Sequence, residues 1–339
     1  MKKLFGSIVK PPCTVDIELE PSGKVTGKGQ TATILVNNPK DRFGNEGIEQ
    51  RLLVFDQADP IQGKVKLSVE KPFDHLGITV ELLGEIVTYL DGRNVSTFLS
   101  ISKELAPPTA PNCPLSRDAE YEFSFKSVDK EWNSYRGINV DVRYYLRVTV
   151  NRSVKVINTI VKEQEFWVQK IVPKPSEEDP GIGMEVGLEG IVLLSIKYNN
   201  VQHDIKNGCI LGDLQFFLVN VKIDKAEVSI IRKETLLGTP SLQVSTPSSS
   251  FKSNSAADEG HSEQEVLHKF EIIDGTPAKD EKVPVRLYLR AIEPWKLTNT
   301  EESVNKKFSV KYFIHLALCD TKGRRFFKQR EIQLYRTGL

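Results

Sequence analysis

Apolar side chains recur at every second position over long stretches of this chain, and this pattern constrains the fold more than any other feature. Between residues 138 and 150 every even-numbered position is aliphatic or tyrosine, and the positions between them are polar or tyrosine. Successive side chains of a strand point to opposite faces, so this alternation produces one apolar and one polar face. On a helix the same apolar residues would surround the whole surface. The pattern therefore predicts a long strand with one solvated face, typical of antiparallel sheets packed as a sandwich.

The alternating segments occur in the same order in both halves of the chain. The matching pairs are residues 63–69 with 212–218, 78–83 with 226–231, and 142–148 with 310–316. The last pair lies within the predicted strands 138–150 and 308–318 and agrees in residue class at every position. Two halves with one strand order predict two copies of one β-sandwich. The alternative is that unrelated strands resemble one another because they share a period.

Proline and acidic residues separate the two halves. Residues 174–183 contain Pro175, Pro180 and a short acidic run, which disfavour a sheet interior and predict a linker. We therefore expect an N-terminal sandwich over residues 1–173 and a C-terminal sandwich over residues 184–339. The segment 238–264 is rich in serine and poor in bulky apolar residues, so we expect a disordered loop there.

Composition excludes several classes of function. Lys plus Arg total 46 and Asp plus Glu total 45, giving a net charge of +1, without the basic surplus of most nucleic-acid-binding proteins. The four cysteines form no CxxC pair and no Cys/His cluster, so we expect reduced thiols and no metal site. The apolar run at residues 191–196, interrupted only by Ser195, is far shorter than the ~20 residues that span a bilayer. We expect a cytoplasmic protein without a nucleic-acid partner.

Motifs of catalysis are absent from the sequence. There is no GxSxG elbow, no phosphate-binding loop and no HExxH pair, and the five histidines are scattered. We therefore expect no enzyme and no cofactor. A double sandwich instead offers exposed strand edges, which an extended peptide can complete through backbone hydrogen bonds.

Two adjacent isoleucines, Ile272 and Ile273, precede the turn signal Asp274-Gly275, which predicts a hairpin. Neighbouring residues of a strand point to opposite faces, so both side chains cannot reach the same core. Either one of them is exposed, or both are buried between two sheets. The residues alone do not decide between these alternatives.

Several blocks resemble the vacuolar protein sorting 26 family, the arrestin-like subunit of the retromer complex. The most specific are residues 304–313 and 324–332, near the C-terminal end. Shorter matches that keep the family's order are residues 13–19, 63–65, 103–105, 184–187 and 271–275. Together they extend from about residue 5 to residue 335. The resemblance implies an all-β, arrestin-like fold of two antiparallel β-sandwich domains joined by a short linker.

The resemblance also implies a non-catalytic function in endosomal protein sorting. Members of the family bind a helical-solenoid scaffold, vacuolar protein sorting 35, and the matching contact positions are Ile272, Ile273, Asp274 and Gly275. This favours exposure of the isoleucines, each of which could contribute about 1.5–3 kcal/mol when buried at an interface.

Cargo recognition is implied for a second set of positions. The family captures cytosolic tails of transmembrane cargo together with a sorting nexin, and Val186 and Phe327 match the residues involved. Asp56 and Ile171 match a patch that contacts the PDZ domain of another sorting nexin in some members. The implied location is peripheral, on the cytosolic face of endosomes. The alternatives are a stand-alone arrestin-type receptor regulator and the related retriever subunit.

Overall fold

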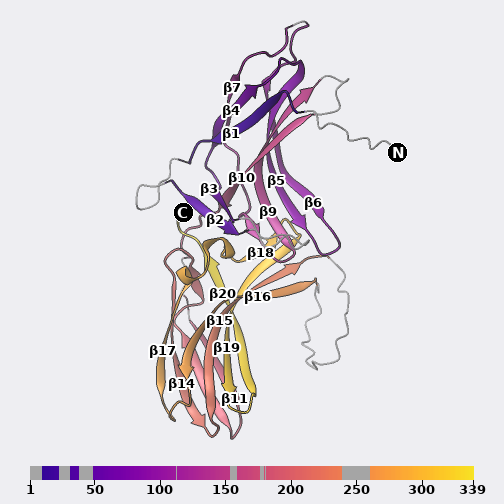
Figure 1. Cartoon of the computed structure of the whole chain (residues 1–339). Coiled ribbons are helices and arrows are strands. Elements are labelled where there is room, and N and C mark those ends of the chain that lie inside the picture. The colour runs from indigo at the N-terminus through magenta and orange to yellow at the C-terminus, as the bar shows by residue number, and fades with distance from the viewer. Residues whose placement is uncertain are drawn as a thin grey trace, which may run out of the picture. The chain divides into compact units, whose positions relative to one another are not determined.

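A computed structural model describes residues 10–22, 31–37, 49–111, 113–152, 159–175, 179, 181–238 and 260–339. In these ranges the regular structure consists of strands and two 3-10 helices of one turn each, η1 (Leu289–Ala291) and η2 (Pro294–Lys296). The chain divides into two compact units (Figure 1). Unit 1 comprises Met1–Ser134 and Asp141–Gln169, and unit 2 comprises Tyr135–Val140 and Lys170–Leu339.

Unit 1 is a sandwich of two sheets. The smaller sheet has the strand order β1-β4-β7, and the larger has the order β2-β3-β10-β9-β5-β6. The pairs β1–β4, β4–β7, β2–β3, β9–β10 and β5–β6 are antiparallel, whereas β3 and β10 are parallel. The strands are β1 (Cys13–Leu19), β2 (Thr33–Asn37), β3 (Glu49–Asp56), β4 (Ile61–Val69), β5 (His75–Thr88), β6 (Asn94–Ala106), β7 (Ala119–Phe125), β9 (Val140–Arg152) and β10 (Ile160–Gln169).

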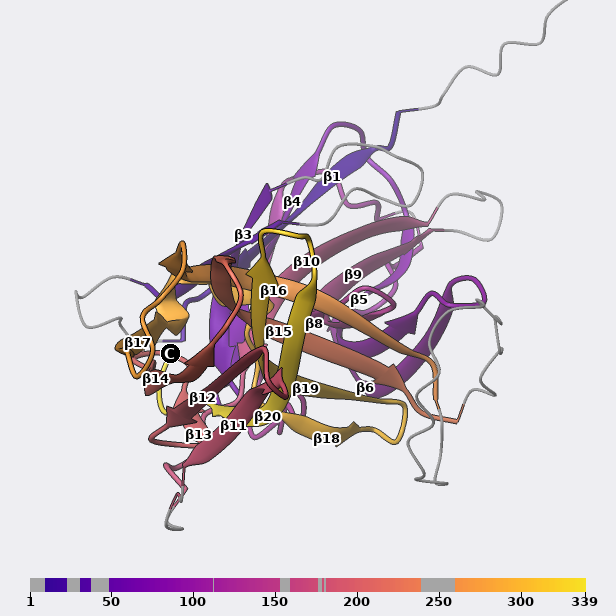
Figure 2. The ribbon, with the colours of Figure 1, turned by 90° about the horizontal axis from the view of Figure 1, so that it is seen from below.

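Unit 2 is a second sandwich. Its sheets have the orders β11-β12-β14-β17 and β13-β20-β19-β15-β16, and β18 also pairs with β19. Figures 1 and 2 show β15, β19 and β20 side by side. Its strands are β11 (Ile182–Leu188), β12 (Val192–Tyr198), β13 (Gln202–Asp204), β14 (Cys209–Val219), β15 (Ile223–Leu236), β16 (Ser262–Asp274), β17 (Lys282–Tyr288), β18 (Glu301–Val304), β19 (Phe308–Asp320) and β20 (Arg325–Tyr335). The two-residue strand β8 (Tyr135–Arg136) belongs to neither of these sheets, because it pairs with β9.

The two units repeat one topology, which confirms the duplication predicted from the sequence. The strand run β10-β9-β5-β6 of unit 1 corresponds to β20-β19-β15-β16 of unit 2, and β1-β4-β7 corresponds to β12-β14-β17. Even the exceptional parallel pair recurs, because β13 lies parallel to β20 as β3 does to β10. The fold class is the predicted one, all-β with two sandwiches.

The predicted alternation determines which residues form the cores. Along β9 and β19 the apolar positions of the period are almost completely buried; they are Val142, Tyr144, Leu146, Val148 and Val150 in β9, and Val310, Tyr312, Ile314, Leu316 and Leu318 in β19. Burial of each such side chain stabilises the fold by about 1.5–3 kcal/mol. The predicted start of the first strand at Ile138 is wrong, because Ile138 is exposed and β9 begins at Val140.

The boundaries in the structure differ from those expected from the sequence. The units divide after Gln169, before the expected limit at residue 173, and β11 begins at Ile182, inside the expected linker 174–183. The segment Tyr135–Val140 belongs to unit 2, which the sequence did not indicate. Of the expected loop 238–264, residues 262–264 are the start of β16, and residues 239–259 lie outside the described residues.

A buried carboxylate holds the segment Tyr135–Val140 in unit 2. The Tyr135 hydroxyl donates a hydrogen bond to Glu234 Oε2 at 3.0 Å, and the Asn139 backbone N–H donates to Glu234 Oε1 at 2.7 Å. The Arg232 guanidinium lies over the Tyr135 ring, 4.9 Å from its centroid. Burial raises the pKa of Tyr135 well above its ordinary value. A charged group this deep is stabilised only by such hydrogen bonds and counter-charge.

Gly137 lies so close to this carboxylate that any side chain there would collide with it. A Cβ atom at this position would overlap Glu234 Oε2 and the Tyr135 ring. We expect Gly137→Ala to destabilise unit 2 by about 1–3 kcal/mol, because overpacking displaces the hydrogen-bonded groups. The measurement is the urea-unfolding midpoint, with Gly183→Ala as the control, since a Cβ at Gly183 would meet no atom within 4 Å. Equal midpoints for the two variants would contradict the prediction.

Candidate partner-binding sites

The two isoleucines implicated in scaffold binding lie at a β-bulge near the end of β16. Ala226 of β15 pairs with Ile273 and the next residue, Glu227, pairs with Glu271, so Ile272 is an extra residue in β16. A bulge bends a strand and redirects its side chains, so neighbouring residues escape strict alternation. Ile272 and Ile273 are both half-buried, which fits neither of the two arrangements considered from the sequence. In the sheet order β16 is an edge strand.

A tight turn follows the bulge, but it does not form the predicted hairpin. Gly275 has φ +92°, a left-handed conformation that favours glycine, and its N–H donates to Asp224 O at 2.7 Å. The Thr276 hydroxyl donates to Ile223 O and accepts a hydrogen bond from Ile223 N, each at 3.0 Å. The next strand, β17, pairs with β14 in the other sheet. The turn therefore connects two sheets, and the prediction of a hairpin is wrong.

Val186 and Phe327, the positions implied for cargo capture, lie on contacting strands of unit 2. Val186 is in β11, at the edge of its sheet, and its side chain is only 4% exposed. Phe327 is in β20 and is 67% exposed, the largest value among the exposed large apolar residues that the structure describes. The two strands are neighbours although they belong to different sheets. At the Val186 position the accessible feature is the backbone of an edge strand, whereas at Phe327 it is the aromatic ring.

The Phe327 ring rests on a histidine that the sequence did not connect with it. The ring centroids of His315 and Phe327 are 5.5 Å apart. Burial, together with the charge of Lys269, lowers the pKa of His315 below its ordinary value, so the imidazole is neutral at pH 7. His315 Nδ1 is buried and has no hydrogen-bond partner among the described residues. The neutral imidazole of His315, whose Nδ1 makes no hydrogen bond among the described residues, therefore packs beneath the exposed Phe327 ring.

The two positions of the implied PDZ patch fall in different units. Asp56 is the last residue of β3 in unit 1, where its backbone N–H donates to Asp59 Oδ2 at 2.8 Å. Ile171 follows β10 and is half-buried, but it belongs to unit 2. Each position is accessible at least in part.

The turn that precedes β20 is fixed by one buried carboxylate. Asp320 Oδ1 accepts hydrogen bonds from the backbone N–H groups of Lys322 and Arg324, at 3.0 and 2.8 Å, and Oδ2 accepts one from Arg324 Nε at 2.6 Å. Burial opposes ionisation of Asp320, but these hydrogen bonds and the positive charge outweigh it, so its pKa lies below the ordinary value. The turn thereby sets the start of the strand that carries Phe327.

Comparison with known proteins identifies the family. The family model for vacuolar protein sorting-associated protein 26 matches residues 10–323. The chain is 36% identical over 338 residues to vacuolar protein sorting-associated protein 26 of Dictyostelium discoideum, covering 99% of this chain and 85% of that protein. It is 34% identical over 320 residues to the mouse protein 26B, covering 92% and 86%, and 36% identical over 319 residues to the Drosophila melanogaster protein, covering 91% and 60%.

The chain belongs to the vacuolar protein sorting-associated protein 26 family.

Membership confirms the resemblance that the C-terminal blocks indicate, and with it the arrestin-like class of the two sandwiches. The family is that of a retromer subunit in vacuolar and endosomal protein sorting. In the part of the chain that the structure describes, no group of three or more His, Cys, Asp or Glu residues could hold a metal ion. No helix among those residues is long and apolar enough to cross a membrane.

The stability of the Asp320 turn in this family member should depend on pH. Because the pKa of Asp320 is lowered by folding, its contribution is complete above the unfolded value of about 4 and is lost as pH falls through the folded value. We expect Asp320→Asn to lower the urea-unfolding midpoint at pH 7, and the difference from the wild type to shrink as the pH is lowered below about 4. A difference that stays constant from pH 7 to pH 3 would contradict this assignment.

Proposed function

We propose that this protein is a non-catalytic subunit of a retromer coat that sorts transmembrane cargo at endosomes. The observation that carries the proposal is membership of the vacuolar protein sorting-associated protein 26 family over nearly the whole chain. Two sandwiches with open edge strands support a binding function, because unpaired backbone groups and half-exposed apolar residues are what an extended partner can use. In this proposal the protein is a peripheral protein on the cytosolic face of the endosome, and its partners attach it to the membrane.

We assign scaffold binding to the bulge of β16. The half-exposed Ile272 and Ile273 present aliphatic surface at the edge of unit 2, and the turn at Asp274 and Gly275 fixes their position. The partner is the helical solenoid vacuolar protein sorting 35. Aliphatic side chains that become fully buried at the centre of an interface act as anchors, and each contributes about 1.5–3 kcal/mol.

The scaffold assignment predicts that Ile273→Asp abolishes complex formation. An unpaired carboxylate buried in an apolar contact costs several kcal/mol, so affinity should fall by about a hundredfold or more. The measurement is isothermal titration of each purified variant with the solenoid scaffold.

The matched control for this experiment is Val266→Asp, because Val266 lies on the same strand and is 47% exposed. It should bind like the wild type, and thermal unfolding verifies that both variants are folded. Undiminished binding by Ile273→Asp would remove the scaffold site from β16. Failure of the wild type to bind any solenoid scaffold would favour a stand-alone arrestin-type regulator.

We assign cargo capture, together with a sorting nexin, to β11 and Phe327. The tail of a cargo protein would pair with the backbone of β11 at Val186, while the exposed Phe327 ring packs against the tail or the nexin. The buried Val186 side chain then acts by keeping the edge of β11 in place. Asp56 and Ile171 are proposed contacts for a PDZ-containing nexin.

The cargo assignment predicts that Phe327→Ser weakens capture without affecting assembly. We expect the affinity of a fluorescent cargo-tail peptide for the retromer–nexin complex to fall by about tenfold or more, since an exposed aromatic anchor is lost. Phe217→Ser is the control, because Phe217 is 38% exposed on β14 in the other sheet. Equal peptide affinity for the wild type and Phe327→Ser would exclude Phe327 from the cargo site.

A further inference from the structure

Two cationic residues of β20 lie on the face of the strand that points toward the core of unit 2. Lys328 pairs with Leu316 of β19, and Arg330 pairs with Ile314. Residues directly opposite one another in an antiparallel pair point to the same side of the sheet. Leu316 and Ile314 are completely buried, whereas Lys328 and Arg330 are exposed. The second sheet of the sandwich therefore does not cover β20 at these two positions.

The same part of β20 is an edge of its sheet. Because β13 pairs only with residues 333–335, residues 325–331 have β19 as their one paired strand among the described residues. The edge strand of the facing sheet, β11, lies next to β20 (Figure 2). We call this side of the sandwich, formed by β11 and residues 325–331 of β20, the seam. Two edge strands border the seam, and Lys328 and Arg330 are exposed along it.

The core-facing side of the seam is positively charged. Residues 325–330 include three cations and no acidic residue. Glu331 pairs with a residue of the outer face, and its carboxylate lies 3.3 Å from Lys311 Nζ. Glu185 of β11 alternates with two buried, core-facing residues, so it points away from the core. On these two strands, as the structure describes them, the core-facing side therefore carries two cations and no carboxylate.

The spacing of the two cations matches the repeat of an extended peptide. Lys328 and Arg330 are two positions apart, and a strand advances about 3.3 Å per residue, so their backbone positions are about 7 Å apart. Side chains at alternate positions of an extended peptide point the same way and repeat at the same distance. Two carboxylates at alternate positions of a peptide in the seam can therefore reach both cations.

We propose that the seam selects cargo tails with two acidic residues at alternate positions, and that Lys328 and Arg330 recognise these residues. The inference rests on the proposed cargo site at β11 and Phe327 and adds the class of tail that this site takes. Each carboxylate accepts charge-assisted hydrogen bonds from one cation, and the planar guanidinium can bind its carboxylate through two N–H groups. Phe327 points to the opposite face of β20, so its contact is separate from the charge contacts.

A membrane surface fits the two cations less well than a peptide does. Basic segments that bind anionic lipids usually have about four or more Lys and Arg residues close together. The core-facing side of the seam has two, placed beside the edge strand β11. A lipid headgroup is therefore the alternative that the experiment has to exclude.

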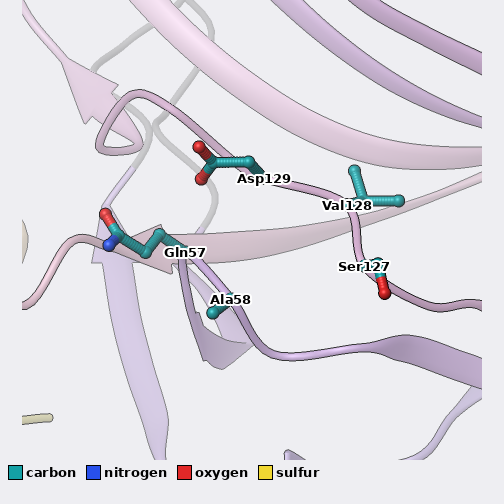
Figure 3. Close-up of a pocket in the computed structure, with 5 residues that line it drawn as sticks. All are labelled: Gln57, Ala58, Ser127, Val128 and Asp129. Atoms are coloured by element: carbon teal, nitrogen blue, oxygen red, sulfur yellow. The ribbon is translucent and has the colours of Figure 1, made fainter.

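The open depression of unit 1 has no comparable arrangement. It lies between the loop after β3 and the loop after β7, and its lining residues are Gln57, Ala58, Ser127, Val128 and Asp129 (Figure 3). Three of them are exposed, so water satisfies their polar groups. All five belong to loops, and their side chains have no regular repeat that an extended peptide could match.

The test compares three fluorescent peptides on the retromer–nexin complex that contains the full-length chain. The peptides are acetyl-Glu-Val-Glu-Tyr-Val-Leu-amide, acetyl-Val-Glu-Glu-Tyr-Val-Leu-amide and acetyl-Gln-Val-Gln-Tyr-Val-Leu-amide. The first two have equal charge, but adjacent carboxylates point to opposite sides of an extended chain. We expect the alternating acidic peptide to bind about fivefold or more tightly than the amide peptide, with the adjacent acidic peptide between them. The difference should shrink as ionic strength rises from about 0.05 M to about 0.5 M.

Two double variants locate the preference. Combining Lys328→Gln with Arg330→Gln should abolish the advantage of the alternating acidic peptide and leave the affinity of the amide peptide unchanged. The matched control combines Arg286→Gln with Arg290→Gln, which removes the same charge from exposed positions in β17 and in the turn after it. This control should keep the preference, because β17 is the opposite edge of the sheet that begins with β11. Thermal unfolding verifies that both double variants are folded.

The outcomes separate this inference from the cargo assignment. Phe327→Ser, which tests the cargo assignment, should weaken all three peptides by the same factor. Equal affinity of the three peptides for the wild type would overturn the inference and leave the cargo site in place. A preference that persists without Lys328 and Arg330 would also overturn it. If that variant instead loses binding to vesicles of phosphatidylserine and phosphatidylcholine, the two cations bind lipid and not cargo.

Discussion

An antiparallel strand has two faces and a sandwich can bury only one of them, so every sheet of this protein combines a core-forming face with a surface that must be compatible with water. Because the sheets are open, each also ends in strands that, within the residues the structure describes, have a neighbouring strand on one side only. These two consequences of one backbone geometry provide both the stability and the binding capacity of the protein. The proposed sites at β11 and β16 are strands of this kind.

The residues that follow strict alternation could be predicted from the sequence, and those that depart from it could not. The two-residue alternation is repeated by many residues. It therefore sufficed to predict the strands β9 and β19, the duplication and the all-β class. The bulge at Ile272 depends on which β15 residue pairs with Glu271, a register that only the folded sheet determines. The Asp274-Gly275 turn has the composition of a hairpin, yet tertiary packing directs the next strand to the other sheet.

The candidate sites illustrate the same limit. The resemblance points to Phe327, which lies at an exposed position of a strand, but it could not show that Val186 is buried or that His315 lies under the Phe327 ring. The buried Lys130 also had no sequence signal, because its Nζ donates to Asp59 O, which lies 71 positions away along the chain. A lone lysine in a sequence ordinarily indicates a solvated surface, whereas Lys130 is fully buried.

The duplication supplies an internal comparison that separates backbone from side-chain contributions to scaffold binding. In unit 1, Ile78 pairs with Ala106 and Thr79 with Glu104, so Leu105 is a bulge residue in β6 just as Ile272 is in β16. The bulge is therefore a property of the shared fold and cannot by itself select a partner. What differs is the side chain next to it, since the second unit has the half-exposed Ile273 where the first has the small, buried Ala106. If β16 is the scaffold site, its preference over β6 arises from this additional aliphatic surface, because both edges offer the same backbone geometry.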